Sequence, residues 1–246
     1  MSRLAGRHAL VTGGGTGIGA AIARALAAEG ASLTLVGRRR DKLEEVASGP
    51  FEALVAPADV ADPDQVERCF ALARAAQGPI DILVNNAGAA QGAPFGEVTD
   101  TLWRHMLAVN LDGVFHCCRA ALADLLAAQS GRIVTIASMA GLHGFAYAAP
   151  YIAAKHGAVG LTRALAAEYA RTRLRVNAVC PGFVDSDMTA ESIANIRART
   201  GRGEAEAAAE LARLNPSGRL IAPDEVARAV LELILSDRNG EAVEIA

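Results

Sequence analysis

The stretch Thr12-Gly-Gly-Gly-Thr-Gly-Ile-Gly19 stands between a short apolar run, His8–Thr12, and an Ala-rich helical pattern over 18–29 that Gly30 ends. Glycines at such a strand-to-helix turn let the backbone turn tightly and approach a pyrophosphate. The first helical turn then offers free N–H groups and the positive end of its dipole to the phosphates. A loop rich in turn residues is the alternative, but the order strand, turn, helix favours a dinucleotide site.

The rest of the chain repeats this alternation of apolar runs and helical patterns. Apolar runs between helices of ten or so residues are typical of a parallel sheet with helices on both faces. We therefore predict an α/β fold, a doubly wound parallel sheet (Rossmann) of about seven strands, as one domain over residues 1–246. Further strands are expected at 32–36, 54–58, 80–84, 132–137, 175–179 and 242–245, and helices at 41–47, 62–76, 99–128, 149–171 and 223–235.

Residues 186–219 interrupt this rhythm. The segment is charged, Ala-rich and long, and it lies between the sixth strand and the last helix. An insertion of this length at that place is more often a lid than a tether. We expect it to act as a substrate lid.

Composition narrows the class of protein. The 246 residues carry a net charge of −3, so no basic excess indicates a nucleic acid or an anionic membrane as partner. No uninterrupted apolar stretch of about 18 residues predicts a membrane span, and the first residues lack the apolar core of a signal peptide. The cysteines have neither metal-ligand spacing nor a disulfide pattern, which predicts reduced thiols, no metal and a cytoplasmic location. They are Cys69, Cys117, Cys118 and Cys180.

The second strand runs into Gly37-Arg38-Arg39. An acidic side chain at that place would hydrogen-bond a ribose 2′-hydroxyl and repel a 2′-phosphate. A guanidinium instead pairs well with phosphate. The sequence therefore predicts a preference for NADP(H) over NAD(H), with a solvated basic cluster as the alternative interpretation.

Four polar residues are candidates for catalysis. Tyr151 and Lys155 are four apart in a predicted helix and share a face, where the ammonium would lower the pKa of the phenol. Ser138 ends the fifth strand, at the sheet edge where ligands bind. Asn110 lies inside a predicted helix, where a buried asparagine is unfavourable unless it has a role. An ordinary surface Tyr–Lys pair is the alternative for the first two.

These motifs together resemble the short-chain dehydrogenase/reductase family over almost the whole chain. The resemblance rests on the glycine pattern Gly-x-x-x-Gly-x-Gly, on the run Asn85-Asn-Ala-Gly88, and on the four residues named above. It implies an oxidoreductase that moves hydride between nicotinamide and a ketone or secondary alcohol. Tyr151 would exchange the proton with the substrate oxygen, and Ser138 would hydrogen-bond that oxygen. Lys155 would hold the nicotinamide ribose, and Asn110 a water linked to Lys155.

The resemblance also implies the residues that contact the cofactor. Asp59 would meet the adenine amino group, Val60 the adenine ring and Val184 the carboxamide. Thr16 stands where some NADP-preferring relatives have a basic residue, and Ser186 where many have threonine. The implied contacts are Gly13, Gly15, Thr16, Gly17, Ile18, Gly19, Arg38, Arg39, Asp59, Val60, Asn86, Ala87, Gly88, Tyr151, Lys155, Pro181, Gly182, Val184, Ser186 and Met188.

The runs 143–157 and 176–184, with Asn215-Pro-Ser-Gly-Arg219, are similar to 3-oxoacyl-thioester reductases, polyketide ketoreductases and 3-hydroxyacyl-CoA dehydrogenases. The expected substrate is a 3-oxoacyl thioester of coenzyme A or an acyl carrier protein, or a related cyclic ketone. The mostly apolar segments 139–148 and 91–95 predict no strongly ionic substrate head. Lid arginines 197, 199, 202 and 213 could meet coenzyme A phosphates, but neighbouring glutamates make a solvated mixed-charge face the favoured reading.

Other functions stay open at this point. A sugar, polyol or steroid dehydrogenase of the same fold would use the same catalytic residues. A cofactor-sensing protein without catalysis is disfavoured because Tyr151 and Lys155 are both present. The family is usually a tetramer, which implies a homotetramer, although the chain stops at Ala246 without the family's glycine-rich tail.

Overall fold

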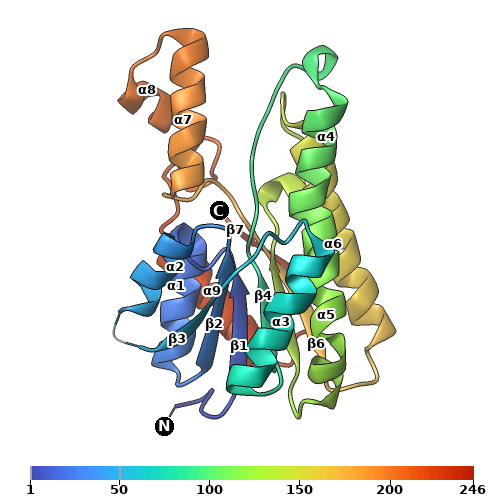
Figure 1. Cartoon of the computed structure of the whole chain (residues 1–246). Helices are drawn as coiled ribbons and strands as arrows, with labels where there is room; N and C mark the ends of the chain where they lie inside the picture. The colour runs from blue at the N-terminus through green and yellow to red at the C-terminus, as the bar shows by residue number, and fades with distance from the viewer. Residues whose placement is uncertain (1, 50) are drawn as a thin grey trace.

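Seven strands form one sheet in which every neighbouring pair is parallel (Figure 1). The computed structural model describes residues 2–49 and 51–246. The spatial order is β3-β2-β1-β4-β5-β6-β7. Strands are therefore added on one side of β1 up to β3 and on its other side from β4 onward, which makes the β1–β4 boundary the topological switch point. All predicted strands are confirmed, with bounds shifted by two residues at most. They are β1 (His8–Thr12), β2 (Ser32–Gly37), β3 (Ala53–Pro57), β4 (Ile82–Asn85), β5 (Arg132–Ile136), β6 (Arg175–Pro181) and β7 (Ala242–Ile245).

Helices cover both faces of the sheet (Figure 1). Side chains alternate between faces along a strand, so Ala9 and Val11 of β1 enter one apolar cluster and Leu10 enters the other. The first cluster is completed by α1 (Gly17–Ala28), α2 (Arg40–Ala47) and α9 (Pro223–Leu235). The second is completed by α3 (Pro63–Gln77), α5 (Gly113–Ala127) and α6 (Ala149–Glu168).

The start of α3 shows how local sequence sets a helix boundary. The Asp62 side chain accepts hydrogen bonds from the backbone N–H groups of Asp64 and Gln65, at 3.0 and 3.1 Å. Pro63 occupies the first helical position, where its missing N–H has no cost. The predicted start of this helix at the aspartate cap is therefore confirmed.

The predicted helix 99–128 is interrupted. It consists of α4 (Asp100–Leu107), a π-helical turn over Ala108–Asp112, and α5, which begins at Gly113. The expected bend near Gly113 thus corresponds to a π-turn that ends just before it. Residues 100–127 are long and apolar enough to cross a membrane by length and composition, but half of the apolar window is buried, as in the core helix of a globular fold.

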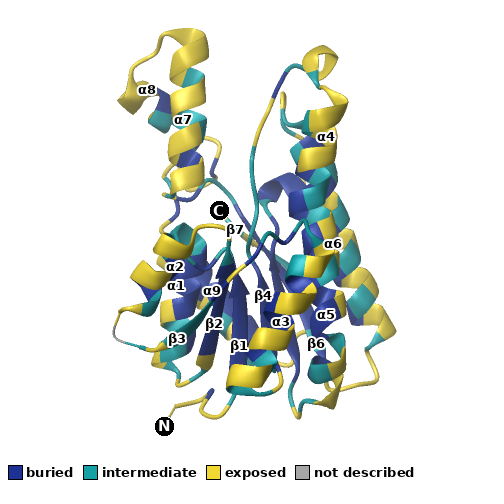
Figure 2. Cartoon of the chain, in the orientation of Figure 1, coloured by how far each residue is buried: buried dark blue, intermediate teal, exposed yellow. Residues whose placement is uncertain are grey.

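Residues 186–219 contain two helices, α7 (Asp187–Thr200) and α8 (Glu204–Ala212), which project beyond the sheet (Figures 1 and 2). Most of their residues are exposed, and the buried ones are Thr189, Ala207 and Leu211. Arg197 pairs with Glu204 at 3.0 Å, and Arg202 pairs with Glu210. Two of the four arginines considered for coenzyme A therefore already have carboxylate partners within the segment.

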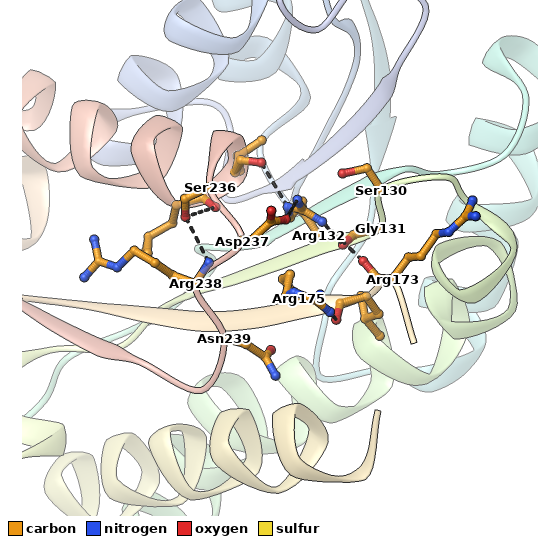
Figure 3. A network of polar contacts seen from close by, with 12 residues as sticks. Ser130, Gly131, Arg132, Arg173, Arg175, Ser236, Asp237, Arg238 and Asn239 are labelled. Carbon is orange, nitrogen blue, oxygen red and sulfur yellow. Dashed lines mark hydrogen bonds and ion pairs between the residues drawn. The ribbon is translucent and has the colours of Figure 1, made fainter. Parts of the chain in front are cut away.

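A buried arginine joins elements at the opposite, amino-terminal edge of the sheet (Figure 3). Arg132 donates to the carbonyls of Ile234, Gly131 and Arg173 at 3.0, 3.0 and 3.3 Å. Its ion pair with Asp237 is weak, because that carboxylate side chain is 91% exposed. Carbonyl acceptors thus satisfy most of the buried guanidinium and hold the end of α9 against β5.

Buried His8 makes the stability of the fold dependent on pH. Its Nδ1 lies 2.9 Å from the Gly78 carbonyl and its Nε2 lies 2.9 Å from Thr34 Oγ1, which places the proton on Nδ1 and leaves Nε2 as an acceptor. Burial lowers the pKa of His8 below its ordinary value of 6.5. The unfolded chain therefore binds this proton more readily than the folded protein when pH falls below 6.5.

We predict that the free energy of unfolding falls as pH drops from 7.5 to 5.5, by at most about 1.4 kcal/mol per pH unit from this residue. His8→Asn should be less stable at pH 7.5 but should lose this part of the slope. The exposed His156→Asn is the control and should keep the wild-type slope. Urea unfolding at several pH values measures all three, and equal slopes for His8→Asn and wild type would refute the assignment.

Candidate active site

The glycine turn after β1 is braced by the segment after β4. Thr12 Oγ1 accepts hydrogen bonds from the backbone N–H groups of Asn86 and Ala87, both at 3.0 Å. Asn86 Nδ2 donates to the carbonyls of Thr12 and Gly13 at 3.1 Å. Gly13 has φ +65°, and a Cβ there would lie 2.7 Å from Asn86 Nδ2 and 2.9 Å from the Ala87 Cα. Only a glycine therefore fits at position 13, where the turn packs directly against Asn86 and Ala87.

The first turn of α1 is suited to an anion. Thr16 is the N-cap, but its side chain makes no capping hydrogen bond, and no acidic residue lies in the first turn. Within the described residues 2–49 and 51–246, these N–H groups therefore have no side-chain acceptor, and the helix dipole adds a positive potential. Together with the glycine turn at Gly13, these N–H groups fit the pyrophosphate of a dinucleotide.

The two arginines after β2 have different surroundings. Arg39 lies 3.7 Å from the Asp187 carboxylate and donates to Thr16 Oγ1 at 3.4 Å. Arg38 is exposed and forms no ion pair with any residue that the structure describes. Arg38 is therefore the arginine whose charge is available to a ligand at the end of β2.

The residues predicted to meet adenine follow β3. The half-buried Asp59 accepts from the backbone N–H of Ala61 at 3.0 Å, which is the local turn that the sequence left as an alternative. Val60 is buried against α5, where a Cβ at Gly113 would lie 2.7 Å from its Cγ2. One carboxylate oxygen of Asp59 is thus engaged in the turn, and little of Val60 is left for a ligand.

Tyr151 and Lys155 lie on one face of α6, beside the end of β5. The Lys155 side chain is buried, and its Nζ donates to the Ile136 carbonyl at 2.9 Å and lies 5.7 Å from the centre of the Tyr151 ring. Ser138 caps the short 3₁₀ turn Met139–Gly141, and its Oγ accepts from the backbone N–H of Ala140 at 3.1 Å. The Ser138 hydroxyl is near enough to Tyr151 to lower the pKa of its phenol. Three of the predicted catalytic residues are therefore brought together.

Asn110, the fourth, lies in the π-turn and is fully buried. Its Nδ2 donates to the carbonyls of Ala89 and Met106 at 2.9 and 3.0 Å, and its Oδ1 accepts from the Ala89 N–H at 3.2 Å. A Cβ at Gly88 would meet Asn110 Oδ1 at 2.9 Å and Lys155 Nζ at 3.7 Å. Gly88 thus lies between the two side chains, and Asn110 ties the π-turn to the segment after β4.

Burial controls the protonation of the pair on α6. It raises the pKa of Tyr151, and the Ser138 hydroxyl only partly opposes this effect. Burial also lowers the pKa of Lys155, to about 8. Desolvation is the largest cause of the Tyr151 shift in this structure, and the lowering of the phenol pKa by the lysine stays a prediction. At neutral pH Tyr151 carries its proton and can donate it.

The turn after β6 lies next to the glycine turn. Val184 is buried and bridges to Ile221. Ser186 Oγ donates to the Val184 carbonyl at 3.3 Å, and a Cβ at Gly17 would lie 3.3 Å from the Ser186 Cβ. Among the other predicted contacts, Ile18 packs on the core and Met188 is exposed in the first turn of α7.

The structure adds features that sequence patterns did not indicate. Tyr147 has φ +64°, and its carbonyl accepts from the Ala93 N–H at 2.8 Å, so the loop before α6 pairs with the loop after β4. His143 Nε2 lies 3.5 Å from Glu244 Oε1 on β7. Asn215 is buried and contacts Phe183. A non-glycine residue at positive φ or a long-range amide contact leaves no periodic signal in a sequence.

The adjacent cysteines belong to the core. Cys117 and Cys118 are buried, and burial raises both pKa values, that of Cys118 to about 12. Asn85 Nδ2 contacts Cys118 Sγ at 3.3 Å. Protonated, enclosed thiols are poor nucleophiles, so packing explains this pair better than redox chemistry.

The comparison with known proteins agrees with this geometry. Residues 7–197 match the family model described as short chain dehydrogenase. The chain is 41% identical over 235 residues to a protein assigned as a ketoacyl reductase of the granaticin polyketide synthase from Streptomyces violaceoruber, covering 93% of this chain and 86% of that one. It is 40% identical over 235 residues to a galactitol 2-dehydrogenase from Cereibacter sphaeroides, covering 94% and 89%.

A solved structure shares the architecture as well. The crystal structure of a single-substitution variant of actinorhodin polyketide ketoreductase with NADPH superposes with a TM-score of 0.92. Its sequence is 38% identical, and the match covers 98% of this chain and 95% of that one. The predicted Rossmann arrangement and the predicted family resemblance are confirmed, and a nicotinamide cofactor follows from both.

We predict that Gly13→Ala weakens the binding of NADPH at least about tenfold, because the new methyl group must displace Asn86 or Ala87 and the strained φ adds to the cost. Gly160→Ala is the matched control, because a Cβ there meets nothing within 4 Å. Titration of NADPH fluorescence measures both dissociation constants. Unchanged binding by Gly13→Ala would show that the turn does not hold the cofactor.

Proposed function

We propose that this chain, which belongs to the short-chain dehydrogenase family, is a nicotinamide-dependent ketoreductase whose substrate is a 3-oxoacyl thioester or a related cyclic ketone. The observation that carries the proposal is the pair on α6 beside Ser138, the half-buried Tyr151 and the buried Lys155. Tyr151 keeps its proton at neutral pH, and Lys155 retains much of its charge with a pKa of about 8. A protonated phenol beside a cation suits the reduction of a carbonyl.

The chain's own residues divide the work. A dinucleotide whose pyrophosphate is held at the glycine turn would supply the hydride from its nicotinamide. Tyr151 gives its phenolic proton to the substrate oxygen, while Ser138 donates a hydrogen bond to the same oxygen. Lys155 would hold the ribose hydroxyls and give a proton to the phenolate left on Tyr151, and a water positioned by Asn110 would return that proton to Lys155 from solvent. The cofactor contacts that the sequence implied, from Gly13 to Met188, are proposed for the same site.

The loops around Tyr151 favour an apolar substrate over a polyol. The side chains of Phe95 and Tyr147 are 77% and 68% exposed, and the Ala93–Tyr147 hydrogen bond joins their loops. Exposed aromatic rings on the loop before α6 and on the loop paired with it offer dispersion and stacking contacts to an acyl or cyclic ketone. A sugar would need several polar partners, and this loop pair offers mainly Gln91 and His143.

We predict that wild type oxidises NADPH in the presence of acetoacetyl-CoA, followed by absorbance at 340 nm. Tyr151→Phe should lose roughly a hundredfold to ten-thousandfold in kcat, because the proton donor is removed. Its affinity for NADPH should change little. Tyr169→Phe, at the other end of α6, is the control and should keep wild-type turnover.

The outcomes separate the functions that remain open. Turnover of cyclic ketones or sugar alcohols without turnover of the thioester would support the oxidoreductase activity and reject the thioester as substrate. Tight NADPH binding without turnover on any ketone or alcohol would favour a cofactor-sensing protein. An undiminished rate in Tyr151→Phe would reject the catalytic assignment.

We also propose NADP(H) as the preferred cofactor. Arg38 is exposed at the end of β2 without an ion pair in the described ranges 2–49 and 51–246, whereas Arg39 is shared between Thr16 and Asp187. A free guanidinium forms charge-assisted hydrogen bonds with a 2′-phosphate and has no equivalent partner on NAD(H).

Arg38→Ala should raise the KM for NADPH by about tenfold to a hundredfold and leave the KM for NADH nearly unchanged, since a hydrogen bond to a charged group contributes about 1.5–3 kcal/mol. The control is Arg40→Ala, whose guanidinium pairs with Glu44 at 3.2 Å within α2. Initial rates with each cofactor measure both. An equal rise with NADH would argue against phosphate recognition.

The proposed assembly is a homotetramer in the cytoplasm. Trp103, Phe115 and Leu126 of the α4–α5 segment are large apolar side chains more than one-third exposed, and β7 is an edge strand of the sheet. Exposed apolar helix faces and unpaired strand edges are features that association covers. Sedimentation as a 25.4 kDa species at micromolar concentration would reject the tetramer.

A further inference from the structure

Two stretches of backbone lie side by side where the α7–α8 segment leaves and rejoins the sheet. Val184 and Ile221 form a parallel bridge. Asp185 N–H donates to the Ile221 carbonyl, and Ile221 N–H donates to the Phe183 carbonyl, both at 2.9 Å. The base of the segment is therefore a short, hydrogen-bonded pair of strands, although the two helices beyond it are largely exposed.

The side chain of Asn215 holds this base together. It is 2% exposed, and its Oδ1 accepts from the Phe183 N–H at 2.8 Å. Its Nδ2 donates to the Phe183 carbonyl at 2.9 Å and to the Arg219 carbonyl at 2.6 Å. One buried amide thus binds both polar groups of Phe183 on the departing strand and a carbonyl on the returning strand.

This amide also constrains the turn after β6. A Cβ at Gly182 would lie 2.2 Å from Asn215 Oδ1 and 3.2 Å from Met139 Sδ. Gly182 is therefore enclosed between Asn215 and the residue that follows Ser138. The position of Asn215 sets how closely the Pro181–Gly182 turn approaches the catalytic end of β5.

We propose that Asn215 is a positioning residue for the cofactor site, an inference that rests on the proposed function. It keeps the turn at Gly182–Phe183 in the geometry that meets the nicotinamide while the exposed α7–α8 segment moves as a lid. Rotation of the Gly182–Phe183 peptide would break the hydrogen bond from the Phe183 N–H, and rotation of the Phe183–Val184 peptide would break the one to the Phe183 carbonyl. The lid can then open and close without moving the turn beneath the reacting ring.

Asn177 provides a matched control on β6, the strand that leads into the turn at Gly182. It is 1% exposed, its Nδ2 donates to the Arg238 carbonyl at 2.8 Å, and its Oδ1 accepts from the Glu241 N–H at 3.1 Å. Asn177 also ties two backbone segments together, but near the start of β6 (Arg175–Pro181), away from the turn at its end. Both alanine variants remove the same kind of contact.

The test measures the Kd for NADPH by fluorescence, kcat with acetoacetyl-CoA and the Tm of wild type, Asn215→Ala and Asn177→Ala. Both variants should have a lower Tm. Asn215→Ala should raise the Kd for NADPH about tenfold and lower kcat as well, since more than one hydrogen bond to the turn is lost. Asn177→Ala should keep Kd and kcat near wild type, at a temperature well below either Tm.

Asn215→Asp keeps the side-chain volume and the acceptor for the Phe183 N–H but removes the amide donors. It therefore replaces Asn215→Ala in the test if that variant does not fold. It should also weaken NADPH binding, and binding should improve as pH falls, because a protonated carboxyl can donate to one of the facing carbonyls. Equal Kd values for the position-215 and Asn177 variants would overturn the proposal. Failure of wild type to bind NADPH would instead reject the proposed function.

Discussion

The common direction of the seven strands places one candidate motif after each of the strands β1 to β6, at one edge of the sheet. The glycine turn follows β1, Arg38 follows β2, Asp59 follows β3 and Asn86 follows β4. Ser138 and the Gly182 turn follow β5 and β6 in the same way. A parallel sheet requires a crossover after each strand, so the carboxyl ends must gather on one side and the helices must cover both faces. The site is therefore a consequence of strand direction, and hydrogen bonds between Thr12 and Asn86 join two of the motifs across the edge.

Desolvation at this edge gives the pair on α6 its chemistry. Lys155 is 5% exposed, and its ammonium is compensated by the Ile136 carbonyl rather than by a carboxylate. Burial lowers its pKa to about 8, while desolvation raises the pKa of the half-buried Tyr151, which therefore holds its proton more firmly. The same apolar packing that stabilises α6 against β5 and β6 thus keeps the acid protonated. Fold stability and proton donation depend on one set of contacts.

The α7–α8 segment divides into a rigid base and an exposed body. The base is held by the Val184–Ile221 bridge and the buried Asn215 amide. The body has few buried residues, and its Arg197–Glu204 ion pair connects its two helices to each other, while Asp187 at the start of α7 pairs with the exposed Arg39 after β2. A segment with little buried apolar surface opens at low cost, whereas its hydrogen-bonded base does not. This division suits an element that must move above a turn that must stay still.

Local patterns in the chain were enough to predict the seven strands, the Asp62 helix cap, the glycine turn and the Tyr151–Lys155 spacing, because each depends on residues a few positions apart. The π-turn that places Asn110 against Ala89 could not be read from periodicity, since the flanking pattern is that of one continuous helix. The effect of burial on the Tyr151 pKa could not be predicted from the sequence, because it depends on how much water the folded chain excludes. The Arg39–Asp187 pair and the Asn215–Phe183 contact join residues far apart in sequence. Their partners are set by packing in three dimensions, for which the order of residues alone carries no local signal.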